Sequence, residues 1–199
     1  MRNLVISAAS AAVLLTATPM SGCSVLSPPN PSKGSQPPAT GATQSRTGAA
    51  RDYSRLLIRP DALGVPGEAY TARPPTLNPH GIPGVSTVFV NRAGTRAVGN
   101  TIFVLATPEA ATASLNGAKQ ALGTVIDGAI AQPAPVGANG TTATGRAPGG
   151  SKAVTVVMFT EGRTFVTLKF DAAPADAVLP AQATQVAQRQ DALIKTTPL

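Results

Sequence analysis

The feature that most constrains the fold is a β-hairpin signal in residues 152–171. Two runs rich in β-branched and aromatic residues, 152–160 and 163–171, flank Glu161-Gly162, which we read as a two-residue turn with Thr160 opposite Arg163. Side chains alternate between the two faces of a strand. One face then carries Val154, Val156, Met158 and Phe165, diluted by Thr167 and Lys169. The other carries Val157, Phe159, Val166, Leu168 and Phe170. Both faces therefore need cover, and a sheet with one solvated face fits poorly.

Two amphipathic segments supply helices for that cover. In residues 107–125, Thr107 suits the N-cap and Pro108 the first helical position. Apolar residues then recur at steps of three and four: Ala111, Leu115, Ala118, Leu122 and Val125. In residues 180–195 a second stripe is formed by Ala183, Val186, Ala187, Leu193 and Ile194. Each stripe is wide enough to pack on one face of a sheet.

The order of the remaining elements predicts the fold class. Residues 85–91 and 96–106 form a first hairpin signal, and residues 141–145 suggest one more strand. Before them, a helical turn at residues 60–63 is capped by Gly64, and the prolines of residues 65–84 favour extended chain. We therefore expect a single α+β domain over residues 51–199, with an antiparallel sheet and helices on both faces.

Residues 1–22 have the layout of a secretory signal peptide. Arg2 supplies a positive charge, and residues 4–17 are mostly apolar but shorter than the roughly 20 residues that span a bilayer. Small residues then lead to Cys23, the single cysteine of the chain, so an intramolecular disulfide framework is excluded. An ordinary secretory signal with a stray cysteine is the alternative, but it does not explain why Cys23 lies at the cleavage position.

This N-terminus resembles a bacterial lipoprotein signal peptide, whose lipobox reads Leu, a small residue, Gly or Ala, and Cys. Ser21, Gly22 and Cys23 match the last three positions, and Met20 stands where leucine is usual. The resemblance implies cleavage before Cys23, a diacylglyceryl group on its sulfur and often an acyl chain such as palmitate on its amino group. It implies a protein anchored by lipid to the extracytoplasmic face of the cell membrane.

Residues 23–50 read as a lipidated, disordered tether. The segment is rich in Pro, Ser, Gly and Thr and has no large apolar residue after Leu26, so burial cannot offset the entropy of ordering it. A flexible coil of about 28 residues reaches roughly 30 Å. That length would hold a domain clear of the bilayer and within the wall layer.

The net charge of +7 becomes 7 − 1 = +6 without Arg2 and favours an anionic neighbourhood. Arg51, Arg55 and Arg59 lie in the densest basic stretch and are candidates for contact with anionic head groups. Solvated arginines that keep the domain soluble are the alternative. Nucleic acid is not expected as a partner, because the basic residues are scattered and aromatic residues are few.

The residues that carry chemistry form no catalytic pattern. His80 is the only histidine, and it lies in a loop between prolines and glycines with no nucleophile elbow in the chain. The carboxylates are dispersed, and no Cys/His cluster offers metal ligands. We therefore expect no catalytic residue, no cofactor and no metal site, and thus a protein that is not an enzyme.

The order of elements, the anchor and the tether together resemble the small cell-envelope lipoproteins of mycobacteria and other actinobacteria, the Lpp/Lpq type. The segments that carry the resemblance are residues 21–23, 55–60, 85–105 and 152–199. Within that group the chain is most similar to LpqN-like proteins, which implies a Mog1/PsbP-like α/β/α sandwich. It also resembles the extracellular sensor domain of the PknH kinase family, whose typical cysteines are absent here.

These observations lead to three hypotheses about function. The first is a non-catalytic binding or accessory module for an envelope protein, a wall polymer, a glycolipid or another lipid. The second is a carrier of an apolar ligand in a pocket between sheet and helix, for which small helical residues leave space: Gly117, Ala118, Gly123, Ala183 and Ala187. The same residues would also allow close packing. The third is a hydrolase that uses His80.

Overall fold

A computed structural model describes residues 51–64 and 68–199, so the predicted signal peptide, lipobox and tether lie outside the described residues. The strands are antiparallel, in the order β1-β3-β4-β8-β7-β6-β5, with β2 beside β3. They are β1 (Tyr70–Ala72), β2 (Thr76–Leu77), β3 (Gly84–Asn91), β4 (Arg96–Val104), β5 (Asp127–Pro133), β6 (Ala138–Arg146), β7 (Ala153–Glu161) and β8 (Thr164–Ala172). The helices are α1 (Pro108–Gln120), α2 (Leu122–Val125) and α3 (Pro180–Thr196). Four 3₁₀ turns are η1 (Ser54–Leu56), η2 (Pro60–Leu63), η3 (Pro79–Gly81) and η4 (Pro174–Asp176).

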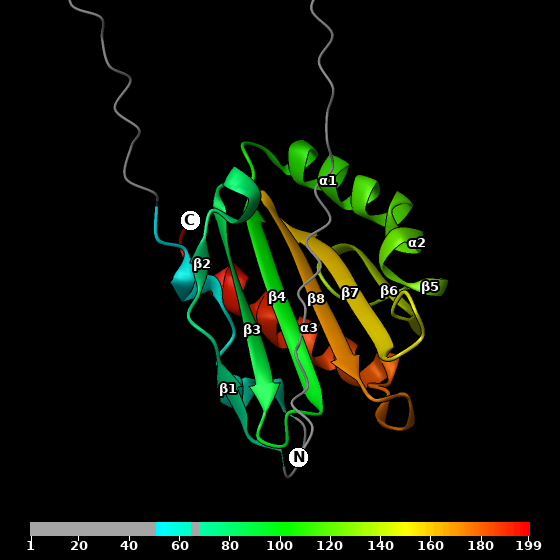
Figure 1. Cartoon of the computed structure of the whole chain (residues 1–199). Helices are drawn as coiled ribbons and strands as arrows, with labels where there is room; N and C mark the ends of the chain where they lie inside the picture. The colour runs from blue at the N-terminus through cyan, green and yellow to red at the C-terminus, as the bar shows by residue number, and fades with distance from the viewer. Residues whose placement is uncertain (1–50, 65–67) are drawn as a thin grey trace, which may run out of the picture. The chain divides into compact units, whose positions relative to one another are not determined.

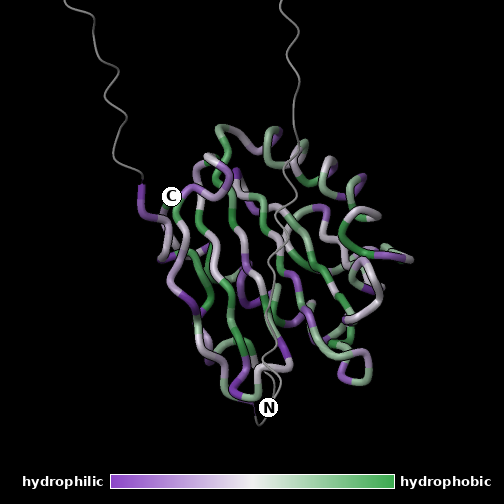
Figure 2. Tube along the Cα trace, in the orientation of Figure 1, coloured by the Kyte–Doolittle hydropathy of each residue, from purple (hydrophilic) through white to green (hydrophobic). Residues whose placement is uncertain are grey.

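Helices cover both faces of this sheet, which confirms the predicted α+β architecture. Figure 1 shows α1 and α2 in front of the sheet and α3 behind it. We call the face under α1 and α2 the front face and the face under α3 the back face. Each face has its own buried cluster, one around Leu115 and Met158 at the front and one around Phe159 and Ile194 at the back. In Figure 2 the hydrophobic colour recurs along the central strands that separate these clusters.

The β7–β8 hairpin confirms the predicted faces but corrects the predicted register. Glu161 pairs with Thr164, so the turn residues are Gly162 and Arg163, and Thr160 faces Phe165 rather than Arg163. Gly162 has φ 52°, a value that favours glycine at the first central position of a tight turn. The shift is two residues, which is one full period of a strand, so no side chain changes face. Val157, Phe159 and Val166 are buried at the back, and Val156, Met158 and Phe165 at the front.

The first predicted helix is interrupted near its end. Thr107 Oγ1 accepts a hydrogen bond from the Ala110 amide at 3.2 Å, as expected of an N-cap. The helix stops at Gln120, and α2 follows as a separate turn. Val125, predicted on the buried stripe, is 44% exposed, while Ile126 is fully buried as the chain becomes extended. The break thus turns the chain toward the outer strand β5.

Strand β5 was not predicted. Its sequence contains one large apolar residue, Ile130, and almost every side chain in it is exposed. Hydrogen bonding to β6 rather than burial makes it a strand. Residues 141–145, predicted as a strand, form the centre of the longer β6.

Helix α3 buries a polar side chain in addition to its predicted apolar stripe. Gln190 is fully buried, and its Nε2 donates to the Leu56 carbonyl at 2.6 Å. Its Oε1 accepts hydrogen bonds from the Ile58 amide at 2.9 Å and from Asn100 Nδ2 at 2.6 Å. The side-chain amide of Gln190 in α3 is therefore hydrogen-bonded both to residues 56–58, which precede the sheet, and to the central strand β4.

None of the helices in residues 51–64 and 68–199 has the length and apolar character needed to cross a membrane.

Candidate functional site

An apolar pocket opens between the α1–α2 segment and the front face of the sheet, with a volume of about 230 Å³. Its helical wall comprises Ala118, Ala121, Leu122 and Val125. Its sheet wall comprises Val156, Met158, Phe165, Thr167 and Lys169. It is thus the kind of sheet–helix pocket that one of the sequence-based hypotheses required.

Small side chains on the helix create this space. Ala118, which is half-buried, and Ala121, which is exposed where α1 ends, line the pocket opposite Met158 and Phe165, and longer side chains there would take up part of its volume. Gly117 and Gly123, predicted to help, do not line the pocket, and a side chain at either position would meet open space. Ala183 and Ala187 of α3 are fully buried in the back cluster, so at these two positions the small residues allow close packing of α3 on the sheet and leave no pocket.

The front face stays open beside the pocket. No helix of the described chain covers β3 and β4 there, and Val88 is 39% exposed. Gly99 of β4 lies between Val88 and Lys169 in the sheet register, and a Cβ on Gly99 would contact little. Thr167 and Lys169 belong both to this open face and to the pocket wall. The pocket therefore continues into a shallow, accessible surface.

Polar groups mark the boundary between the pocket and the open face. Ser86, Thr101 and Thr167 pair across β3, β4 and β8, which places three hydroxyl side chains in one row. Next to them Lys169 Nζ binds both carboxylate oxygens of Asp171, at 2.7 and 2.9 Å. This pair neutralises its own charge, so the rim offers hydrogen-bond donors and acceptors without a net charge.

The sequence contained a signal for this rim. Thr167 and Lys169 interrupt an otherwise apolar face of the hairpin, and such interruptions suit a boundary between buried and open surface. The partnership of Lys169 with Asp171 follows from strand alternation, since residues two apart share a face. The position of α1 over only part of that face could not be predicted from either pattern.

A second hollow beside α3 is larger, at about 440 Å³, but its lining is more polar. Gln182, Gln185 and Arg189 contribute to it, and Arg189 Nη1 donates to the Ala62 carbonyl at 3.0 Å. The front pocket is therefore the better site for an apolar group.

The three predicted basic contacts do not form one patch of free cations. Arg51 is exposed at the start of the described chain. Arg55 donates from Nη2 to the Pro198 carbonyl at 2.8 Å. Arg59 Nε lies 3.5 Å from Asp61 Oδ1, with both side chains largely exposed. The predicted role of Arg51, Arg55 and Arg59 against anionic head groups stays a prediction.

His80 lies in η3, is exposed and has φ 58°. Within the part of the chain that the structure describes, no three His, Cys, Asp or Glu side chains gather in a way that could hold a metal ion. The predicted lipobox residues Met20, Ser21, Gly22 and Cys23 lie outside the described residues.

No protein-family model, no curated protein and no solved structure matches this chain.

Proposed function

We propose that this protein is a non-catalytic binding module, lipid-anchored through Cys23 at the extracytoplasmic face of the cell membrane, whose domain binds the hydrocarbon part of an envelope lipid. The observation that carries the proposal is the apolar pocket between α1–α2 and the sheet, open to an uncovered sheet face. Ligand sites are commonly apolar hollows with a few polar groups at the rim that orient the ligand. Thr167, Lys169 and Asp171 are such groups.

The size of the pocket limits what it encloses. Its volume of about 230 Å³ lies below the roughly 300–1,000 Å³ that is usual for sites enclosing a whole ligand. At about 30 Å³ for a water-sized group, it holds roughly eight such groups. This suits a segment of one hydrocarbon chain rather than both chains of a diacyl lipid. The rest of the ligand would lie on the open face around Val88 and Gly99.

The rim restricts the polar part of the ligand. Since Lys169 is already paired with Asp171, a bare anion would have to compete with the carboxylate for the ammonium group. A polar part that donates and accepts hydrogen bonds suits the rim better, because it can use the pair and the neighbouring hydroxyl row together.

Binding is tested through Met158, which lines the pocket. The chain has three methionines, Met1, Met20 and Met158, so a mature protein that begins at residue 23 contains Met158 alone. With residues 23–199 produced without the signal peptide and carrying Cys23→Ser, we expect one ¹³C-methyl methionine resonance that shifts saturably when lysolipids or a dodecyl amphiphile are added below their micelle concentration. An unchanged Met158 resonance with each probe would contradict the proposed ligand class.

The anchor has its own test. Full-length protein in its native host is expected in the membrane fraction, with the N-terminal peptide carrying the mass of a diacylglyceryl group on Cys23. Cys23→Ser, placed behind a signal peptide whose cleavage needs no lipidation, is expected to release it from that fraction, since two or three acyl chains provide the stable anchoring that protein surface contacts do not. A Cys23→Ser protein that stays in the membrane fraction would refute the anchor while leaving the pocket experiment valid.

A further inference from the structure

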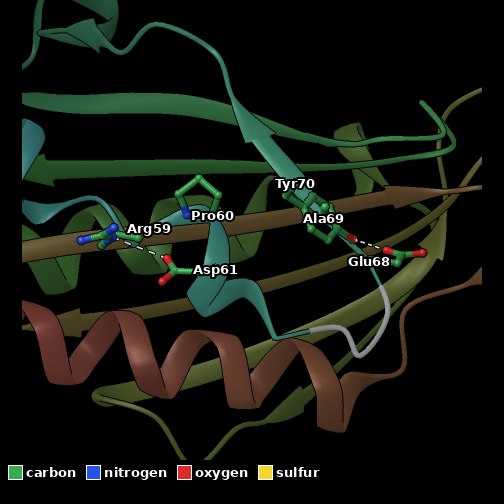
Figure 3. A pocket seen from close by; sticks show the side chains of 6 residues that line it. All are labelled: Arg59, Pro60, Asp61, Glu68, Ala69 and Tyr70. Atoms are coloured by element: carbon green, nitrogen blue, oxygen red, sulfur yellow. Dashed lines mark hydrogen bonds and ion pairs between the residues drawn. The ribbon is translucent and has the colours of Figure 1, made fainter.

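A hollow of about 510 Å³ lies at the opposite side of the sheet from the apolar pocket, between η2 and β1. Figure 3 shows its lining: Arg59, Pro60, Asp61, Glu68, Ala69 and Tyr70. Tyr70 pairs with Asn91, which alternates with the back-face residue Phe89, so the Tyr70 ring lies on the back face. This hollow and the apolar pocket are therefore separate sites.

The Tyr70 side chain is held in place by Glu68, two residues earlier in the chain, and through Glu68 by Arg96 of β4. Its hydroxyl donates to Glu68 Oε2 at 2.8 Å, and Arg96 Nη1 of β4 lies 3.1 Å from Glu68 Oε1. Burial, together with the hydrogen bond and the charge of Glu68, raises the pKa of the Tyr70 phenol above its ordinary value. The ring is thus fixed and uncharged at neutral pH, which lowers the entropy cost of using it as a binding surface.

The hollow combines flat apolar surface with polar groups at its side. The Tyr70 and Pro60 rings contribute the apolar surface, and Arg59 and Asp61 form an ion pair at 3.5 Å whose side chains are largely exposed. Within the two ion pairs of the lining the charges balance, because Arg59 is matched by Asp61 and Arg96 by Glu68. The two ion pairs therefore give no net electrostatic attraction for a charged ligand. The apolar surface of the Tyr70 and Pro60 rings is also too small to cover a hydrocarbon chain.

We infer that this hollow binds a ring of a neutral saccharide, as part of a polysaccharide chain. A pyranose or furanose ring carries C–H groups on its face and hydroxyls on its edge. The C–H face of one ring can lie on the Tyr70 ring, and hydroxyls of a neighbouring ring of the same chain can donate to the Asp61 carboxylate and accept from the Arg59 guanidinium on the other side of the hollow. Thr71 and Ala72 of β1 are exposed beside the hollow, so further rings of a longer chain can extend from it into solvent.

The test uses the mature chain with Cys23→Ser and a panel of neutral tetrasaccharides: gluco-, galacto-, manno- and arabino-oligosaccharides, with a hexuronate tetrasaccharide as the anionic arm. The protein has no tryptophan, and its second tyrosine, Tyr53, is only 5% exposed, so a change in tyrosine emission reports chiefly on Tyr70. We expect at least one neutral tetrasaccharide to bind with a Kd of about 1 mM or below. Binding should change less than about twofold between low and high salt, since no net charge is neutralised.

Substitutions of Tyr70 test whether its aromatic ring is the surface that binds the saccharide. Measured by calorimetry, Tyr70→Ala should weaken binding about tenfold or more, whereas Tyr70→Phe, which keeps the ring, should stay within about threefold. Thr71→Ala is the matched control, because Thr71 pairs with Val90 and lies on the opposite face of β1. The Met158 methyl resonance should not move with saccharide, which separates this site from the lipid pocket.

Three results would each overturn the inference. The first is no binding of any neutral tetrasaccharide up to about 20 mM, a concentration well above typical Kd values for weak sites. The second is a preference for the hexuronate that disappears in salt. The third is unchanged affinity in a folded Tyr70→Ala protein.

Discussion

Gln190→Ala is expected to lower the free energy of unfolding by about 3–5 kcal/mol, because it leaves three buried partners without a hydrogen bond. Those partners are the Leu56 carbonyl, the Ile58 amide and Asn100 Nδ2. Asn100 already has one buried atom, Oδ1, with no partner among the described residues. Water has little access to a side chain that is fully buried, so solvent cannot replace the lost bonds.

Urea unfolding followed by far-UV circular dichroism measures this loss, with the slope of the transition expected to stay constant. Gln185→Ala is the control, since Gln185 lies on the same helix but is exposed, and it should change stability by no more than about 0.5 kcal/mol. A Gln190→Ala protein within about 1 kcal/mol of the parent would show that the network contributes little.

Ala118→Phe is expected to weaken binding of a dodecyl amphiphile about tenfold or more by filling the front pocket. Ala118 is half-buried on α1 and lines the pocket opposite Met158 and Phe165, so a benzyl group there occupies the space proposed for the hydrocarbon chain. The pocket is empty space rather than packed core, so the added ring should cost no more than about 1–3 kcal/mol of stability.

The Met158 methyl resonance shows whether Ala118→Phe fills the front pocket or instead unfolds the protein. In folded Ala118→Phe protein it should sit at a new position without ligand and no longer shift on titration, because the aromatic ring then lies beside it. Ala113→Phe is the matched control, since Ala113 is exposed on the same helix and should leave the titration unchanged. Full binding by a folded Ala118→Phe protein would place the hydrocarbon chain elsewhere.

The two proposed sites lie on opposite sides of one sheet, so their ligands need not compete. The apolar pocket lies under α1–α2, and the Tyr70 hollow lies at the edge strand β1. If residues 23–50 form the predicted tether of roughly 30 Å, such a domain would reach both lipid and the polysaccharide next to the membrane. Wild-type saccharide affinity in the Ala118→Phe protein would support this independence.

Much of the fold could be predicted because the β7–β8 hairpin carries apolar side chains on both faces. Val157 and Val156 had to be buried on opposite sides, whatever the turn, and helices were the available cover. The register of the hairpin was wrong by two residues because its turn depends on the φ angle that glycine adopts at Gly162. Strand β5 was missed because an edge strand needs hydrogen bonds more than buried side chains.

The sites were harder to predict, because each depends on residues far apart in the chain. Ala118 was recognised as small, but whether a small residue leaves a pocket or allows close packing depends on how far the helix stands from the sheet. Tyr70, Glu68 and Arg96 carry no motif, and the strand pairings of β1, β3 and β4 bring them together.

By itself, the sequence determined the α+β class, the two-sided burial of the central hairpin and the capped start of α1, since periodicity and caps are local properties. The tertiary structure alone decided that α1 stops short of β3 and β4, that Gln190 is a buried junction and that Tyr70 faces a hollow. Pockets and buried polar networks arise from the distances between packed elements, and local patterns do not encode those distances.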